Sequence, residues 1–143
     1  MIILALGSNL GNRQANLDLA IAMLKAKLID NVKKSSVIET APLLPTNPEQ
    51  GWEQLNFLNM CISGKLKKPM QPEDILEITK SIETEVGRKP AAKWAPRIID
   101  IDIIAIDDLV YSSPTLTIPH KEALKRDFVM KPLQEICPDW NHL

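Results

Sequence analysis

Aromatic residues are scarce in this chain, which has two phenylalanines, one tyrosine and three tryptophans among 143 residues. A sheet that binds RNA needs exposed aromatic side chains on which bases stack, and a general nucleic-acid binder is normally basic. This chain instead carries a formal net charge of -1. The composition therefore argues against a nucleic-acid partner.

Cysteines and long apolar runs are also few. Cys61 and Cys137 lie far apart and form no C-x-x-C motif, so we expect two reduced thiols rather than a disulfide framework. Met1–Leu6 is apolar but lacks a basic segment, and no apolar run reaches transmembrane length, so neither a signal peptide nor a membrane partner is expected. We expect one cytoplasmic domain spanning residues 1–143.

Hydrophobic periodicity predicts alternating strands and helices. Strands are expected at Ile2–Leu6, Val32–Thr40, Leu55–Lys65 and in the isoleucine-rich run that ends at Ile104; helices are expected at Arg13–Leu28 and Pro72–Val86; shorter elements are expected at Leu109–Tyr111, Lys121–Lys125 and Pro132–Cys137. The order β-α-β-β-α-β predicts an α+β protein with a ferredoxin-like core, in which helices pack on an antiparallel sheet and C-terminal additions follow. Such folds host many functions, so the fold alone indicates none.

Two aspartates in the last predicted strand are the most informative residues. Asp100 and Asp102 alternate with Ile99, Ile101 and Ile103, so both carboxylates should project from one face, about 7 Å apart at the backbone. Two such carboxylates can bind hard cations together with substrate phosphates, as magnesium is held at ATP sites. The alternative is that both are solvated residues on the wet face of an antiparallel sheet.

Cations gather beside these aspartates. The loop that leads into the strand contains Arg88, Lys89, Lys93 and Arg97. Such a cluster suits a polyphosphate, although a solvated loop is the simpler alternative. His120, on a proline turn, and Arg126 could add phosphate contacts. The Walker sequence is absent and Gly7-Ser8-Asn9 is expected to form only a tight turn, so metals and side chains would have to hold the phosphates.

Motifs in a fixed order cover nearly the whole chain: Gly7-Ser8-Asn9-Leu10, Thr40-Ala41-Pro42, Phe57-Leu58-Asn59, Ile82-Glu83, Gly87-Arg88, Trp94-Ala95-Pro96-Arg97, Asp100-Ile101-Asp102, Leu116-Thr117-Ile118-Pro119-His120 and Arg126-Asp127-Phe128. In these motifs the chain resembles the 6-hydroxymethyl-7,8-dihydropterin pyrophosphokinase family of folate biosynthesis. The resemblance implies magnesium-dependent transfer of the β,γ-pyrophosphoryl group of ATP to the hydroxymethyl oxygen of the pterin, with release of AMP.

The resemblance also implies residue roles. Asp100 and Asp102 would hold two magnesium ions and, with Arg88 and Arg97, form the catalytic set. The implied ATP-binding residues are Lys80, Glu83, Arg88, Trp94, Arg97, Ile103, Thr117, His120, Lys121 and Arg126. The implied pterin-binding residues are Thr40, Ala41, Pro42, Leu43, Phe57, Asn59, Asp100 and Phe128. The two phenylalanines would sandwich the ring while Asn59 reads its polar edge; alternatively, both are core residues and Asn59 is a strand amide.

Several positions depart from the family pattern. Thr115 stands where an arginine is frequent, Lys121 where a tyrosine is frequent, Lys80 where a polar amide is expected, and Ala95 where a glycine is usual. The loop 88–94 is about one residue short and the loop 43–54 is long, so we expect unusual kinetics of two lids. Because family members occur fused to dihydropteroate synthase, the chain is either a separate protein or the N-terminal module of a longer protein that is fused to this enzyme. The rival hypothesis is a ferredoxin-like module that binds a ligand without catalysis.

Overall fold

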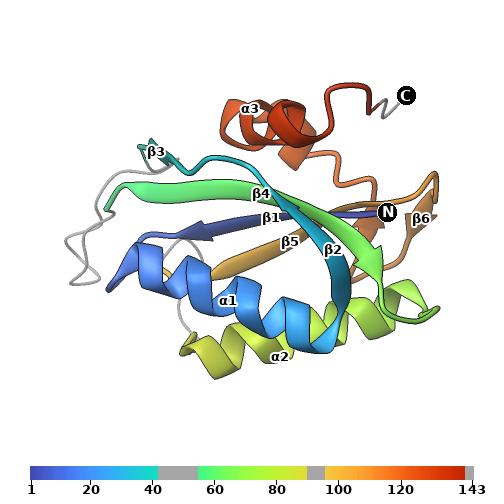
Figure 1. The fold of residues 1–143 in the computed structure, drawn as a ribbon, viewed down its shortest axis with the longest axis horizontal. Helices are drawn as coiled ribbons and strands as arrows, with labels where there is room; N and C mark the ends of the chain where they lie inside the picture. Colours follow the sequence, from blue (N-terminus) through green and yellow to red (C-terminus); the bar gives the residue numbers. More distant parts are fainter. Residues whose placement is uncertain (42–54, 90–95, 141–143) are drawn as a thin grey trace.

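The computed structural model describes residues 1–41, 55–89 and 96–140. A sheet forms the middle layer, with α1 and α2 on one face and α3 on the other (Figure 1). The helices are α1 (Arg13–Lys27), α2 (Pro72–Val86) and α3 (Asp127–Ile136), and a short 3-10 turn, η2, spans Ala123–Lys125. The strands are β1 (Ile2–Ser8), β2 (Ile29–Lys34), β3 (Ile38–Thr40), β4 (Phe57–Leu66), β5 (Asp100–Ile106), β6 (Tyr111–Ser112) and β7 (Thr117–Ile118).

The sheet order is β2-β4-β1-β5, and β3 also pairs with β4. Each of these pairings is antiparallel. If β2 and β3 are counted as one interrupted strand, the second β-α-β unit interleaves with the first, as in the ferredoxin-like arrangement. The predicted α+β fold is therefore confirmed. The remaining strands, β6 and β7, form a separate two-stranded sheet.

The single strand predicted over 32–40 is wrong, because the chain breaks between β2 and β3. Ser35 lies at the break, where its hydroxyl donates to the carbonyl of Ser36 at 2.8 Å and accepts the N–H of Cys61 at 2.9 Å. A serine side chain that bonds to nearby backbone groups competes with the strand ladder. Upstream, the pairing of β2 with β4 also shifts register between Asp30 and Lys33.

The last helix also differs from the prediction, because it begins at Asp127 rather than at Pro132. Pro132 lies inside it, although proline usually disfavours a helix interior. Val129, Leu133 and Ile136 are buried at helical spacing, so burial of this face compensates for the missing N–H. The short strand predicted at 109–111 is observed one or two residues later, as β6.

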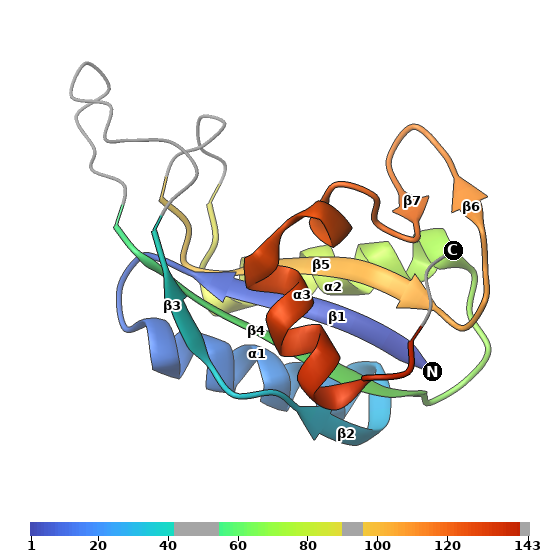
Figure 2. The same cartoon turned by 90° about the horizontal axis from the view of Figure 1, so that it is seen from above.

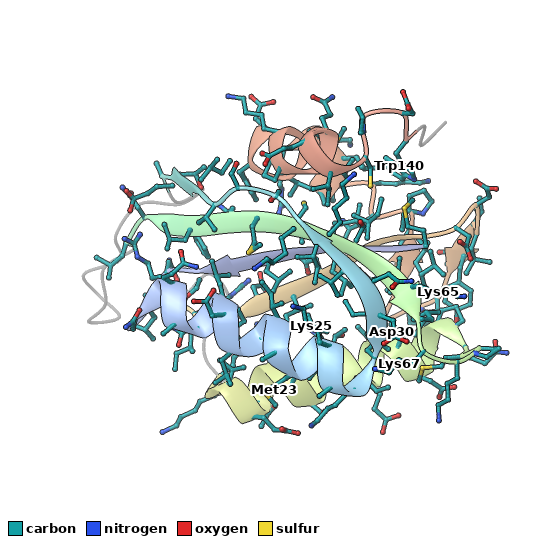
Figure 3. All side chains as sticks on the ribbon, in the orientation of Figure 1. Met23, Lys25, Asp30, Lys65, Lys67 and Trp140 are labelled. Carbon is teal, nitrogen blue, oxygen red and sulfur yellow. The ribbon has the colours of Figure 1, made fainter. Side chains whose placement is uncertain are left out.

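Two apolar clusters hold the layers together. The larger lies between the sheet and the helices α1 and α2, where side chains fill the space in Figure 3. The smaller lies beneath α3, which runs across the sheet in Figure 2, and includes Ile3, Cys61 and Leu133. At the rim of the first cluster, Lys67 pairs with Asp30 at 2.8 Å (Figure 3). Within the described ranges, no helix is both long and apolar enough to cross a membrane.

An irregularity in β5 fixes which face its side chains occupy. Leu4 pairs with Ile103 and Ile3 with Ala105, so Ile104 is an extra residue in the ladder. Ile99, Ile101 and Ile103 belong to the cluster facing α1 and α2, as the predicted alternation requires, whereas Ile104 and Ala105 belong to the cluster beneath α3. Asp100 and Asp102 therefore lie on the α3 side of the sheet, just before the part that α3 covers.

Candidate active site

Three neighbouring strands bring the predicted pterin and metal residues onto one face. Gly7, in β1, pairs with Asn59 of β4 on one side and with Asp100 of β5 on the other. Because strands lie about 4.8 Å apart, Asn59 and Asp100 are about 10 Å apart at the backbone. Ala5 separates Cys61 from Asp102 in the same way. The middle strand thus places only small side chains between the two sets.

Gly7 shapes this face of the sheet, and the sequence interpretation missed it because Gly7-Ser8-Asn9 was assigned to a turn. It lies inside β1, where an added Cβ atom would stand 2.8 Å from Asn59 Oδ1 and 3.4 Å from Phe57 Cδ1. Only a glycine leaves room for both side chains in this arrangement. A glycine at the end of an apolar strand was the available signal.

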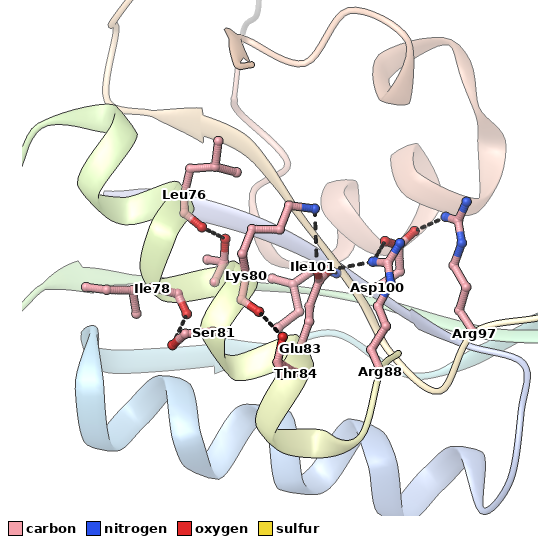
Figure 4. Close-up of polar contacts among 11 residues, drawn as sticks. Leu76, Ile78, Lys80, Ser81, Glu83, Thr84, Arg88, Arg97, Asp100 and Ile101 are labelled. Atoms are coloured by element: carbon pink, nitrogen blue, oxygen red, sulfur yellow. Dashed lines mark hydrogen bonds and ion pairs between the residues drawn. The ribbon is translucent and has the colours of Figure 1, made fainter. Parts of the chain in front are cut away.

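Asp100 lies between two arginines. Arg88 Nη1 donates to Asp100 Oδ1 at 2.9 Å, and Arg97 Nη1 donates to Oδ2 at 3.0 Å (Figure 4). All three side chains are about one quarter exposed, so these charge-assisted bonds are only partly screened by solvent. The predicted catalytic arginines and the first predicted metal ligand therefore meet at one point.

Glu83, on α2, contacts the residues around Asp100. Its side chain is 4% exposed, and Oε2 accepts the backbone N–H of Ile101 at 2.7 Å and pairs with Arg88 at 3.0 Å. Lys80 lies 3.4 Å from Oε1 (Figure 4). Burial raises the pKa of the Glu83 carboxyl, while the Ile101 N–H and the charges of Lys80 and Arg88 oppose the rise. Glu83 thus joins α2 to β5 directly beside the aspartates.

Asp102 has a different environment from Asp100. Burial, followed by the nearby charges of Asp100 and Glu83, raises its pKa to about 7. Among the described residues, no cluster of three or more histidine, cysteine, aspartate or glutamate side chains is placed to hold a metal ion. A hard cation here would therefore have the two aspartates as protein ligands and would need further oxygens from water or substrate.

A cavity of about 470 Å³ adjoins Asp102. It is lined by Leu76, Lys80, Ile101, Asp102, Ile103, Ser113, Pro114, Thr115, Leu116, Thr117, His120, Lys121 and Glu122. The structure thus brings together Lys80, Ile103, Thr117, His120 and Lys121 from the predicted ATP-binding set. Its lining holds both charged and apolar groups, which suits a ligand with a polar and an apolar end.

His120 has a defined tautomer in this cavity. Its Nδ1 accepts the N–H of Ala123 at 3.0 Å, so the neutral ring carries its proton on Nε2. Burial lowers the pKa of His120 below its usual value, with a further lowering from the charge of Arg126. The ring is therefore neutral at neutral pH and presents one N–H donor.

The predicted pterin residues are only partly brought together. Asn59 Nδ2 donates to Thr40 Oγ1 at 2.6 Å, and Thr40 pairs with half-buried Phe57 across β3 and β4. Phe128 is half-buried on α3, where it packs against the cluster beneath that helix and lies 5.8 Å below the guanidinium of Arg126. Ala41 is exposed at the end of the described segment. Pro42, Leu43 and Trp94, with most of both predicted lids, lie outside the described residues.

Asn9 is a second residue that the sequence interpretation missed. It is fully buried, and its Oδ1 accepts the N–H of Arg97 at 2.7 Å while its own N–H donates to the carbonyl of Arg97 at 3.0 Å. Its Nδ2 donates to the carbonyl of Leu55 at 3.1 Å. Asn9 thereby fixes the backbone on both sides of the site, next to Arg97 and two residues before Phe57.

This fold and this face combine a ferredoxin-like sheet with paired aspartates, two arginines and a cavity lined by charged and apolar groups, which is the kind of arrangement expected of a phosphoryl-transfer site. A model of the 7,8-dihydro-6-hydroxymethylpterin-pyrophosphokinase (HPPK) family matches residues 3–138. The chain belongs to this family, as its sequence motifs predicted.

Curated relatives agree with this membership. The chain is 38% identical over 136 residues to the 2-amino-4-hydroxy-6-hydroxymethyldihydropteridine pyrophosphokinase of Bacillus subtilis, covering 94% of this chain and 76% of the relative. It is 39% identical over 142 residues to the protein of the same name from Aquifex aeolicus, covering 99% of this chain and 82% of the relative.

Other relatives are longer proteins. The "Folate synthesis bifunctional protein" of Chlamydia trachomatis is 37% identical over 96% of this chain, which spans 30% of that protein's length. A crystal structure of an HPPK-DHPS in complex with substrates superposes with a TM-score of 0.69 at 14% identity, covering 99% of this chain and 40% of that one. This likeness supports the fold.

Proposed function

We propose that this chain transfers the β,γ-pyrophosphoryl group of ATP to the hydroxymethyl oxygen of 6-hydroxymethyl-7,8-dihydropterin, giving AMP and the pterin diphosphate. The activity follows the family and the names of its relatives in Bacillus and Aquifex. The observation that carries it for this chain is the meeting of Asp100 with Arg88 and Arg97 beside the cavity that adjoins Asp102.

Magnesium is the proposed metal, held by Asp100 and Asp102. Their carboxylates are hard oxygen ligands, and only two protein ligands suit an ion that arrives with phosphate and keeps several waters. When bound, magnesium would supply charge neutralisation for the phosphate oxygens during in-line displacement. Asp102, with its pKa of about 7, must release its proton before it can act as a ligand.

Arg88, Arg97 and His120 are the proposed phosphate contacts. The two arginines converge on one carboxylate, so a small rotation of either guanidinium would turn N–H donors toward a phosphate while the other keeps Asp100 in place. His120 would donate its Nε2–H as a neutral group. Lys80, Glu83, Ile103, Thr117, Lys121 and Arg126 complete the proposed nucleotide set, together with Trp94.

The pterin is proposed to lie over Gly7, between the β4 and β5 side chains. Thr40, Asn59 and the backbone of 41–43 would meet its polar edge, and Phe57 and Phe128 would stack on its faces. Asp100, two strands away from Asn59, would then face the hydroxymethyl group. The glycine at position 7 favours this placement, because it leaves room for the Asn59 and Phe57 side chains that would contact the ring.

Purified protein incubated with ATP, magnesium and 6-hydroxymethyl-7,8-dihydropterin should release AMP in step with the pterin diphosphate, and only when magnesium is present. Chromatography of both products checks this. Asp100→Ala and Asp102→Ala should each keep the fold and slow turnover by at least ~10³-fold, because each removes a metal ligand.

Asp108→Ala is the matched control, since Asp108 is an exposed aspartate in a turn and does not line the cavity. ATP that binds but is never consumed would contradict the proposal and favour the ligand-binding module. A decrease in turnover of less than tenfold in both the Asp100 and the Asp102 variant would contradict the proposal that these residues hold the metal.

The product is a small soluble diphosphate, so we propose a cytoplasmic site of action and, as partner, a dihydropteroate synthase. Residues 1–143 would act as a single unit, either alone or joined covalently to that partner. The bifunctional relative from Chlamydia trachomatis, of which this chain spans 30%, supports the joined form.

A further inference from the structure

A carboxylate outside the site described above connects α2 to the hairpin formed by β6 and β7. Glu73 lies in the first turn of α2 and accepts hydrogen bonds from three hydroxyls. Thr115 Oγ1 donates to Oε2 at 2.8 Å, Tyr111 donates to Oε1 at 3.0 Å, and Ser113 also donates to Oε1. These hydrogen bonds lower the pKa of Glu73, so the group is a charged acceptor at neutral pH.

Ser113 extends this network into the backbone of the hairpin. Its hydroxyl oxygen accepts the N–H of Leu116 at 3.1 Å and the N–H of Thr115 at 3.3 Å. The N–H of Ser113 in turn donates to the carbonyl of Leu116 at 2.8 Å. Because the Glu73 carboxylate orients the hydroxyl proton of Ser113, the hydroxyl oxygen of Ser113 can accept both backbone N–H groups. These hydrogen bonds fix the backbone of residues 113–116.

The fixed segment is one wall of the cavity beside Asp102. Ser113, Pro114, Thr115, Leu116 and Thr117 all line it. Leu76 and Lys80, on the helix that carries Glu73, line the same cavity. Glu73 therefore joins the two elements whose separation sets the width of the cavity.

We propose that Glu73 is a positioning residue for the nucleotide, which holds the wall 113–117 against α2 without touching the ligand itself. The role rests on the proposed function, because that function places ATP in this cavity. Glu73 would affect binding of the nucleotide but not binding of the pterin, because Phe57 and Asn59 lie on the opposite edge of the site.

The test compares Glu73→Ala with Asp74→Asn. Asp74 is exposed in the same helical turn, so the control reproduces the loss of a negative charge at the helix N-terminus. The Kd for the magnesium complex of a methylene analogue of ATP should rise about five- to tenfold in Glu73→Ala, as expected for loss of one or two net hydrogen bonds. The KM for the pterin should stay within twofold, and Asp74→Asn should bind both ligands as the unmodified chain does.

Amide hydrogen exchange of the ligand-free protein separates this inference from the proposed function. In Glu73→Ala the amides of Thr115 and Leu116 should exchange at least tenfold faster, whether or not the chain makes AMP. Faster exchange without any nucleotide binding by the unmodified chain would overturn the positioning role together with the proposed function. Faster exchange with an unchanged nucleotide Kd would overturn the positioning role alone.

Thr115→Val covers the case in which Glu73→Ala does not fold. It removes one donor to Glu73 at nearly constant volume and leaves α2 intact. The nucleotide Kd should then rise about two- to fivefold with an unchanged pterin KM. An unchanged nucleotide Kd in Thr115→Val would overturn the proposal.

Discussion

Gly7→Ala tests whether the middle strand must be bare for the pterin to bind. The new Cβ would stand 2.8 Å from Asn59 Oδ1, whereas ordinary van der Waals contacts begin at 3.4 Å. Asn59 cannot move freely, because its Nδ2 already donates to Thr40 Oγ1 at 2.6 Å and its side chain is buried. The methyl group would therefore displace the amide from the position in which we propose that it meets the pterin.

Two opposing contributions determine how much Gly7→Ala changes the stability of the protein. Overpacking costs about 1–3 kcal/mol, whereas replacing glycine by alanine lowers the entropy of the unfolded chain and returns about 0.4–1 kcal/mol. A net destabilisation of about 0.5–2 kcal/mol leaves the protein folded. Losing one or two hydrogen bonds from Asn59 to the pterin costs about 1–2 kcal/mol, which is about a five- to thirtyfold rise in the pterin KM.

Steady-state kinetics with each substrate in turn, together with urea unfolding, checks this prediction. The ATP KM should stay within twofold in Gly7→Ala. Gly64→Ala is the control, because its Cβ would crowd the Asp30 carbonyl at 3.0 Å, remote from the site, and should lower stability without changing the pterin KM. An unchanged pterin KM in a folded Gly7→Ala protein would refute the reasoning.

Three further predictions concern the aspartate side of the site. In the metal-free protein, the pKa of Asp102 is about 7 when the chain is folded and about 3.9 when it is unfolded, so the stability that this group contributes is lost as the pH rises between the two values. The melting temperature of Asp102→Asn, relative to that of the unmodified chain, should therefore increase from pH 4 to pH 8. A constant difference in melting temperature would contradict the raised pKa of Asp102. Asn9→Ala leaves the partly buried N–H of Arg97 without its side-chain acceptor and should lower the free energy of unfolding in urea by about 1–3 kcal/mol; a loss below about 0.5 kcal/mol would contradict the role of Asn9 in fixing this backbone. Arg97→Ala should lower kcat with little change in the pterin KM, and a pure loss of pterin affinity would contradict its role.

The sequence predicted the parts of this molecule that depend on local periodicity. Alternation of apolar and acidic residues placed Asp100 and Asp102 on the face opposite Ile99, Ile101 and Ile103, and the structure confirms it. Short-range patterns of this kind survive folding because a strand has only two faces. The ferredoxin-like order was predictable for the same reason, since each element could be recognised separately.

Features that depend on pairing between distant segments were missed. From the sequence, Ser35 was predicted to be one more strand residue, and its bond to Cys61 is evident only in the structure. Gly7 was likewise predicted to lie in a turn, whereas the structure pairs it with Asn59. Asn9 belongs to the Gly7-Ser8-Asn9-Leu10 motif, but the motif does not reveal its structural role, because that role depends on hydrogen bonds to Arg97 and Leu55, 88 and 46 residues away. The roles of the site residues themselves stay predictions that the experiments above would decide.

The ion pairs around Asp100 bear on how fast an anionic ligand can arrive. Asp100 and Glu83 face Arg88, Arg97 and Lys80, and Asp102, with its pKa of about 7, adds part of a third negative charge. The charges of this inner set therefore nearly cancel before any ligand is bound. A balanced cluster projects little potential beyond about 8 Å at physiological ionic strength, and diffusional steering of a nucleotide needs a field of one sign. The association rate of ATP should consequently depend only weakly on salt, with its charge recognised at contact, as arginine N–H groups exchange a carboxylate for a phosphate.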